Sequence, residues 1–491
     1  MFLRYAQYFL AASLVVATSS AQTAGSAVRS ERSKVEVYES TADLKESLQK
    51  KPDLEFGQAQ VNALAITVDQ SKTYQQMDGF GASITDSSAW LIHNKLNSEE
   101  RKDLMKRLFD PVNGIGLSFL RQPMGASDFA LNDYSYDDLP AGQTDPEMKR
   151  FSIDHDRAYI LPVLQQALAI NPQLKIMATP WSPPGWMKSS GSLIQGTLLK
   201  SFYPALAKYF AKFIQAYTLA GVPIYAVTMQ NEPLYVPTDY PGMRVSADEQ
   251  LSFVRDHLAP GLRESGLNTK ILIFDHNWDL IAFPQQVLVD PKAAAAVAGT
   301  ATHCYGGDVS AQNKLHDQFP AKEIWETECS GGEWQKGNLL EHQAKLIIEV
   351  TRAWAKSVVL WNLALDQANG PHTGGCGTCR GLVTIRNDEA AQSSTMTSPT
   401  KLTVDYFALG HISKFVVPGA YRIESNSFEK DSLIDVAFKN LDGSIVLLAL
   451  NSGDKAQKVE VDWDNEHFDY TLAAGTLVTF QWHGSPVPQG R

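Results

Sequence analysis

The chain has 491 residues, which is enough for one large domain and a smaller module. A formal net charge of −11 argues against a surface that binds polyanions, so we expect no nucleic-acid partner. Hydrophobic residues at 44% and charged residues at 20% are ordinary proportions for a soluble globular protein.

The N-terminus has the pattern of a secretory signal peptide. Arg4 precedes an apolar run over residues 8–17, and Ser19 and Ala21 stand at the −3 and −1 positions of a cleavage site. The run is too short to span a bilayer, and no later stretch is apolar enough to do so. We therefore predict that residues 1–21 are removed. The mature chain is expected to be secreted, extracellular or periplasmic, without an integral membrane segment.

Residues 22–75 are expected to form a polar N-terminal segment that supplies strands to a β-sandwich. The segment is rich in Ser and Thr and partly disordered up to about residue 50, apart from Val35–Tyr38, which we expect to pair as an edge strand. Ala63–Val68 predicts a second strand.

Eight apolar runs alternate with helical patterns between residues 76 and 405. One helix is predicted after Asn97, which forms a capping box with Glu100 and precedes the apolar positions Leu104, Met105 and Leu108. The alternation predicts an α/β fold with a (β/α)8 TIM barrel as the catalytic domain. A doubly wound open sheet is disfavoured because no Gly-rich phosphate-binding sequence follows the first run. The eight runs are Gly79–Ile84, Gly116–Gln122, Leu174–Thr179, Ile224–Gln230, Lys270–Phe274, Ala298–His303, Glu323–Thr327 and Ser357–Leu363.

Residues 406–491 change to short β-rich runs, which predict an appended all-β sandwich domain. The strands before residue 70 are expected to join it, so that both chain ends build the sandwich. Leu441–Gly443 predicts a hairpin turn. The runs are Tyr421–Ser425, Ile434–Lys439, Ser444–Leu450, Lys458–Trp463, Phe468–Leu472 and Thr476–Trp482.

The residues at the C-terminal ends of the eight runs are mostly polar or aromatic. Active sites of barrels are built at these strand ends, so we expect the side chains to meet there. They are Asp86, Arg121, Trp181, Asn231 with Glu232, Asp275 to Trp278, His303 with Tyr305, Glu328, and Trp361 with Asn362.

Glu232 and Glu328 follow the fourth and seventh runs, which face each other across the mouth of a barrel. A half-buried glutamate at a strand end has a raised pKa that suits a general acid, although such a residue alone more often caps a helix. Two facing carboxyls can flank one glycosidic bond. Glu326 is an alternative to Glu328 as the second carboxyl of this pair. Because Glu326 lies deeper in the same strand, we expect it to be a supporting group instead.

Each of the other strand-end residues has a functional and a structural interpretation. Arg121 can hold the nucleophile ionised, bind a sugar hydroxyl, or form a structural ion pair. Trp181, Tyr305 and Trp361 are candidate sugar platforms, although each of these types is more often a core residue.

The four cysteines do not form a disulfide scaffold. Cys376 and Cys379 form a C-x-x-C in a Gly-rich loop, and an exported chain favours a short disulfide there. Cys304 and Cys329 each stand at a strand end. A four-cysteine zinc site is disfavoured because only one C-x-x-C is present.

With these residues in place, the chain resembles glycoside hydrolase family 30, the family that includes lysosomal glucosylceramidase. The likeness runs from about residue 76 to the C-terminus. It is carried by residues 79–86 (GFGASITD), 121–129 (RQPMGASDF), 180–188 (PWSPPGWMK), 231–233 (NEP), 327–329 (TEC), 361–365 (WNLAL) and 410–415 (GHISKF).

The resemblance implies a barrel with a two-ended sandwich and hydrolysis with retention of anomeric configuration. It makes Glu328 the nucleophile and Glu232 the acid/base, and it implies that no metal or organic cofactor is needed. It also places contacts to the glycone sugar at Asp86, Trp181, Asn231 and Trp361, and puts Arg121, His303 and Tyr305 around the nucleophile.

The loop at residues 370–381 departs from glucosylceramidase, which leaves the substrate open. We expect a retaining β-glycosidase that acts on β-glucosides, including glucosylceramide-type glycolipids. The alternatives are an endo-β-1,6-glucanase or a β-xylosidase of the same family. Two rivals of other classes are a non-catalytic carbohydrate-binding protein and a metal-dependent hydrolase that uses His303, Cys304 and Cys329.

Overall fold

The computed structural model describes residues 34–58, 63–390, 396–428 and 433–483. The predicted signal peptide, residues 1–21, lies outside them. The described residues belong to one compact unit. Within these four ranges, no helix has the length and apolar character needed to cross a membrane.

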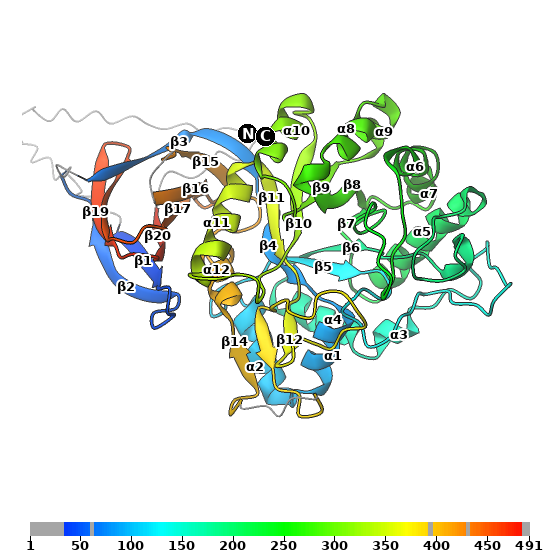
Figure 1. Ribbon diagram of the computed structural model, residues 1–491. Helices are drawn as coiled ribbons and strands as arrows, with labels where there is room; N and C mark the ends of the chain where they lie inside the picture. Colours follow the sequence, from blue (N-terminus) through cyan, green and yellow to red (C-terminus); the bar gives the residue numbers. More distant parts are fainter. Residues whose placement is uncertain (1–33, 59–62, 391–395, 429–432, 484–491) are drawn as a thin grey trace, which may run out of the picture. The chain divides into compact units, whose positions relative to one another are not determined.

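Eight parallel strands close into a barrel in chain order, with β11 paired to β4 (Figure 1). This confirms the predicted TIM barrel, and every predicted apolar run overlaps one of its strands. The strands are β4 (Gly79–Ser83), β5 (Phe119–Pro123), β6 (Lys175–Thr179), β7 (Ala226–Thr228), β8 (Lys270–Asn277), β9 (Gly299–His303), β10 (Glu323–Cys329) and β11 (Ala355–Leu360).

Helices cover the outside of the barrel, and their caps follow the sequence. In α2, Asn97 caps the first turn and Glu100 completes the capping box, as predicted, while Leu104, Met105 and Leu108 are buried. A π turn at Val254–Leu258 joins α6 to α7. The helices are α1 (Asp86–Asn94), α2 (Ser98–Phe109), α3 (Asp154–Arg157), α4 (Ile160–Ile170), α5 (Tyr203–Leu219), α6 (Ala247–Phe253), α7 (Ala259–Glu264), α8 (Ala282–Leu288), α9 (Pro291–Ala296), α10 (Ser310–Gln318), α11 (Leu339–Arg352) and α12 (Val404–Ser413).

The barrel interior is a packed core. Phe119, Met177, Leu272 and Trp325 meet inside it, and the Trp325 indole donates a hydrogen bond of 2.7 Å to Asp78. Because side chains fill the interior, we expect a substrate to bind at the end where the loops after the strands lie.

The second layer is one curved nine-stranded sheet built from both ends of the chain, which confirms the predicted sandwich module. Its order is β19-β18-β3-β15-β16-β17-β20-β1-β2. Its two ends meet, because the Gly57 amide donates to the His467 carbonyl at 2.7 Å. The strands are β1 (Lys34–Ser40), β2 (Gln49–Glu55), β3 (Leu64–Gln76), β15 (Tyr421–Ser425), β16 (Leu433–Lys439), β17 (Ser444–Asn451), β18 (Gln457–Trp463), β19 (Glu466–Leu472) and β20 (Leu477–His483).

The N-terminal strand is not the edge strand that the sequence predicted. Strand β1 pairs with β20 on one side and with β2 on the other. Strand β2 was missed because its sequence, QKKPDLE, is polar, and its burial pattern is correspondingly exposed.

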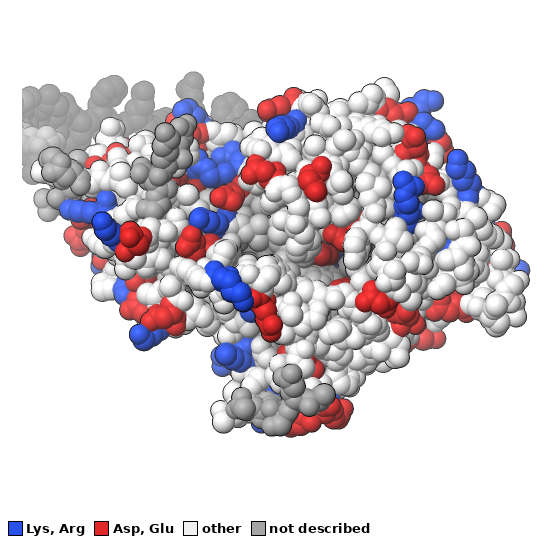
Figure 2. Space-filling view, viewed as in Figure 1, with Lys and Arg blue, Asp and Glu red and all other residues white. Residues whose placement is uncertain are grey.

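A small three-stranded sheet follows the barrel, with β12 (Ala364–Asp366), β13 (Val383–Ile385) and β14 (Thr400–Leu402). Helices α11 and α12 then pack between the barrel strands and the nine-stranded sheet (Figure 1). On α12, His411 is buried and its ring nitrogens lie 2.8 Å from the hydroxyls of Thr479 and Ser40. Figure 2 shows basic and acidic side chains interspersed on the face drawn there.

Candidate active site

A cavity of about 490 Å³ lies at the C-terminal ends of the barrel strands. It contains both predicted glutamates, Glu232 and Glu328, together with Tyr305 and Trp361. The full lining is Asp128, Glu232, Tyr235, Asp239, Tyr240, His276, Asn277, Tyr305, Glu328, Trp334, Trp361, Gly375, Cys376 and Cys379.

Glu232 follows β7 in a left-handed backbone conformation with φ of 44°. Its amide donates to the Asp275 carbonyl at 2.9 Å, which ties it to the end of the next strand. Its carboxylate oxygen Oε1 lies 3.3 Å from His303 Nδ1 and 3.5 Å from His276 Nδ1. The strained conformation at this position is typical of functional residues.

Glu328 lies on β10, with its side chain 7% exposed. The fully buried Arg121 of β5 donates to Glu328 Oε2, and the Tyr305 hydroxyl donates to Oε1 at 3.0 Å. Arg121 also donates to Asn231 Oδ1 at 2.7 Å. The ion pair between Arg121 and Glu328 is therefore the contact through which Arg121 could also keep Glu328 ionised.

Asp275 is the buried centre of this network, although no role was predicted for it. It accepts from Arg121 at 2.9 Å and lies 2.9 Å from His303 Nε2, and Thr327 donates to it at 2.6 Å. The register of β8 against β9 shifts between Phe274 and His276, and Asp275 has φ of 70°. Such a bulge re-aims side chains at a strand end, which regular alternation along the strand does not predict.

Burial and charge act on these groups in opposite directions. Burial raises the pKa of Glu232, but the hydrogen bond and charge of His303 outweigh it, so the pKa is lowered rather than raised as we predicted. Burial dominates at Glu328 and raises its pKa against the charges of His303 and Arg121. Although burial disfavours the imidazolium, Glu328, Asp275 and Glu232 raise the pKa of His303 to about 10. Burial also acts to raise the pKa of Asp275, but Arg121 and His303 outweigh it and lower this pKa.

The two predicted tryptophans form a stack beside Arg121. The rings of Trp181 and Trp361 lie 5.2 Å apart at 24°, and the Arg121 guanidinium carbon lies 4.9 Å from the Trp181 ring centre. Of the two, Trp361 lines the cavity and Trp181 is not among its lining residues. Tyr305 is 43% exposed and can present its ring to a ligand.

Asp86 is not among the residues that line the cavity, and its contact with the sugar stays a prediction. Its Oδ1 lies 2.7 Å from His155 Nε2 and accepts from the Tyr159 hydroxyl at 2.6 Å. Its Oδ2 accepts the Leu131 amide at 2.9 Å. Both oxygens are thus occupied, and Asp86 holds the loop that carries Asp128.

Asp128 and the loop at residues 370–381 complete the wall of the cavity, and Asp128 was not predicted as a site residue. Burial and the charge of Glu328 raise the pKa of Asp128 well above its usual range. Thr373 donates its amide to the Asp128 carbonyl at 2.8 Å, and the Gly375 amide donates to Asp239 at 3.2 Å. The sequence could have indicated Asp128, because this residue lies within the stretch RQPMGASDF, which carries part of the family resemblance.

The cysteines pair as Cys376–Cys379 and Cys304–Cys329. The sulfurs of Cys304 and Cys329 are bonded to each other and are not available as thiolate metal ligands. His303 contacts Asp275 and Glu232 through its two ring nitrogens. This arrangement argues against the alternative of a metal site built from His303, Cys304 and Cys329.

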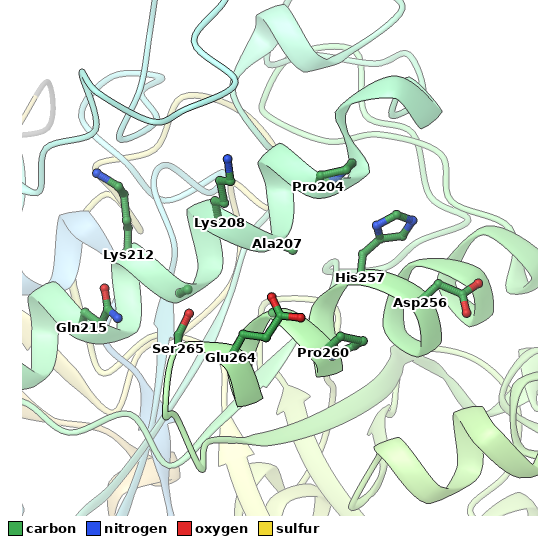
Figure 3. A pocket seen from close by; sticks show the side chains of 12 residues that line it. Pro204, Ala207, Lys208, Lys212, Gln215, Asp256, His257, Pro260, Glu264 and Ser265 are labelled. Atoms are coloured by element: carbon green, nitrogen blue, oxygen red, sulfur yellow. The ribbon is translucent and has the colours of Figure 1, made fainter.

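Another hollow, of about 420 Å³, lies between helices α5 and α7 (Figure 3). Lys208 and Lys212 line one side of it and Glu264 the other. These residues are on outer helices, whereas the active sites of barrels lie at the C-terminal ends of the strands. This hollow is therefore not a candidate active site.

The comparisons with known proteins agree with this fold and site. Residues 77–416 match the glycosyl hydrolase family 30 TIM-barrel domain, and residues 419–480 match the family's beta sandwich domain. The chain therefore belongs to glycosyl hydrolase family 30. It is a glycoside hydrolase, and this excludes the alternative of a non-catalytic carbohydrate-binding protein.

Its relatives include two kinds of glycosidase. The chain is 33% identical to endo-1,6-beta-D-glucanase neg1 of Aspergillus fumigatus over 72% of this chain and 74% of that protein. It is 28% identical to lysosomal acid glucosylceramidase of Mus musculus over 88% of this chain and 86% of that protein. Among solved structures, an endo-beta1,6-glucanase superposes with a TM-score of 0.83 at 32% identity, covering 92% of this chain and 100% of that one.

Proposed function

We propose that this chain is a retaining endo-β-1,6-glucanase. The sequence alone placed glucosylceramide-type β-glucosides first and β-1,6-glucan second. Relatives named as endo-1,6-beta-glucanases, at 33% to 35% identity, support the second reading more strongly than the glucosylceramidases at 28% to 30%.

The observation that carries the substrate class is the chemistry of the cavity wall. Among the described residues, the side chains that line the cavity are acidic, amide, imidazole, aromatic or disulfide groups, and none is aliphatic. Aromatic faces and hydrogen-bonding groups suit sugar rings, whereas the acyl and sphingoid chains of a glycolipid require apolar contact. A glucan chain therefore fits this wall better than a ceramide.

In the first step, the Glu328 carboxylate attacks the anomeric carbon while the departing oxygen takes a proton from Glu232. A covalent glycosyl-enzyme forms at Glu328. Arg121 and Tyr305 hold one oxygen each of Glu328, which fixes its direction of attack. Water that is deprotonated by Glu232 then releases the sugar with its β configuration restored.

The proton for the leaving oxygen is stored on Glu232 and His303 together. With the pKa of His303 near 10, the imidazole carries it in the free enzyme. His303 passes this proton to Glu232 across 3.3 Å, and Glu232, which lines the cavity, passes it on to the leaving oxygen. Glu232 is thereby left as the carboxylate that deprotonates water in the second step, and the proton then returns to His303.

We also propose that the mature enzyme acts outside the cytoplasm. The signal-peptide pattern at residues 1–21 and the two disulfides support this location. N-terminal sequencing of the exported protein checks it, and an intact Met1 would contradict it.

A substrate panel tests the proposed function. Initial rates are measured on β-1,6-glucan, glucosylceramide in detergent, an aryl β-glucoside and a β-xylan at equal concentration of glycosidic bonds. The glucan is expected to be cleaved fastest, with large fragments appearing early. Faster cleavage of glucosylceramide or the xylan would reject the assignment.

A further inference from the structure

A second cavity, of about 350 Å³, adjoins the catalytic one. It lies between helix α11 and the loops after β8, β9 and β10. Tyr305 and Trp334 line both cavities, so the two are continuous across these aromatic side chains.

Helix α11 presents a polar stripe to this second cavity. His342, Lys345, Leu346 and Glu349 line it at the spacing of one helical face. Gln343 also lines it, and although this side chain is only 1% exposed, its Oε1 has no hydrogen-bond partner among the described residues. A buried amide oxygen without a partner costs free energy unless a ligand or water satisfies it.

Trp334 is held in place between the two cavities. A Cβ atom on Gly332 would lie 2.0 Å from the Trp334 ring, so the ring packs directly on the glycine backbone. The side chain nevertheless remains 49% exposed. An aromatic ring that is fixed but exposed is suited to stacking on a sugar ring, because little conformational entropy is lost on binding.

We propose that this second cavity is an accessory subsite that binds a further glucosyl residue of a glucan chain that extends from the catalytic cavity. The inference rests on the proposed function and extends it. In this subsite the sugar ring of the bound glucosyl residue stacks on Trp334. The polar side chains of α11 exchange hydrogen bonds with the hydroxyls of that sugar.

The test compares substrates of different length. The double variant Lys345→Ala/Glu349→Ala removes two polar groups of the subsite without touching the catalytic cavity. The matched control Lys314→Ala/Asp317→Ala removes the same charges from exposed positions of α10, which line neither cavity. Gln343→Leu is a second variant of similar volume. For each, kcat/KM is measured on β-1,6-linked gluco-oligosaccharides from disaccharide to hexasaccharide and on an aryl β-glucoside.

The wild type and the control are expected to gain kcat/KM with chain length. The double variant should lose about tenfold on the hexasaccharide and less than about twofold on the aryl glucoside, and Gln343→Leu should show the same length-dependent loss. If the variants follow the control at every length, the subsite is rejected while the glucanase assignment stands. A wild type that cleaves none of the β-1,6-linked substrates would overturn both.

Discussion

Glu326 and Glu328 lie two residues apart on β10 but differ in environment. Glu326 is fully buried, and burial raises its pKa to about 8. Its Oε2 accepts from Thr302 at 2.7 Å and from Gln312 at 2.9 Å. Glu328 instead meets the Arg121 guanidinium and lines the cavity. The deeper carboxyl is therefore neutral at pH 7 and supports the strand end, whereas the outer one can react.

A pair of isosteric substitutions separates these roles. Because Glu326 is protonated at neutral pH, Glu326→Gln is expected to keep activity within about tenfold. Glu328→Gln removes the attacking oxygen and should lower kcat by about 10³-fold or more. Steady-state rates on β-1,6-glucan measure both. Near-wild-type activity of Glu328→Gln would show that the nucleophile is elsewhere.

Asp156 makes the stability of the barrel depend on pH. Its carboxylate accepts the hydroxyl hydrogens of Tyr136, at 2.6 Å, and Tyr217. Burial nevertheless raises its pKa from 3.8 to about 6. Because the folded state binds this proton more tightly than the unfolded state, the stabilisation is complete below pH 4 and is lost as the pH rises through 6.

Asp156→Asn should therefore remove this pH dependence. Relative to wild type, the free energy of unfolding of the variant should rise by about 2 kcal/mol between pH 4 and pH 7. Urea titrations at several pH values measure the difference. Parallel curves for the two proteins would rule out Asp156 as the titrating group.

The sequence predicted the position of several site residues but not their contacts. Glu232 and Glu328 line one cavity because residues at strand ends meet at the barrel mouth. The role of Asp275 depends on a bulge in β8, which leaves no simple mark in the sequence. Asp86 stands at a strand end but is bound by His155 and Tyr159, which come from a distant loop and helix.

At the scale of elements, the loop after β10 depends on two glycines. A Cβ at Gly331 would lie 2.2 Å from the Arg380 guanidinium, and one at Gly332 would enter the Trp334 ring. The glycines let Arg380 reach Asp405 at 2.6 Å and let Trp334 fold over the backbone. Backbone packing of this loop thus sets the side wall of the cavity.

Gly332→Ala is predicted to displace Trp334 and to lower kcat/KM on β-1,6-glucan about fivefold to tenfold, with a loss of stability of about 1 kcal/mol. The matched control is Gly261→Ala on α7, where a Cβ would meet only Ala207, at 3.4 Å. Equal activity of the two variants would show that the position of Trp334 is unimportant.

The strand pattern of the barrel could be predicted because each strand is a short buried apolar run between helices. Strand β2 could not, since it has no apolar alternation. The small sheet of β12, β13 and β14 was also missed. Its strands have only three residues each, which is too short for a periodic pattern.

At the scale of the whole molecule, Arg352 joins the barrel to the sheet. From the end of α11 it donates to the carbonyls of Asp435, at 2.9 Å, and Ser425, at 3.0 Å. Its Nη1 also lies 3.5 Å from the buried Asp435 carboxylate. Burial raises the pKa of Asp435 to about 6, so the carboxylate is charged at pH 7 and depends on Arg352 for compensation.

Arg352→Ala is predicted to destabilise the protein by about 2–3 kcal/mol at pH 7. The cost should be smaller at pH 5, where Asp435 is protonated. Denaturant unfolding followed by tryptophan fluorescence measures it, with Arg263→Ala on the exposed side of α7 as a control expected within about 0.5 kcal/mol of wild type. An equal loss in both variants would contradict a specific role of Arg352.

The most direct test of the proposed enzyme is proton NMR of β-1,6-glucan during the first minutes of digestion. A retaining endo-glucanase releases new reducing ends as the β-anomer, and the α-anomer appears later by mutarotation. The expected result is an early β-anomeric signal together with a rapid fall in chain length. Early release of the α-anomer, or an unchanged glucan, would contradict the mechanism built on Glu232 and Glu328.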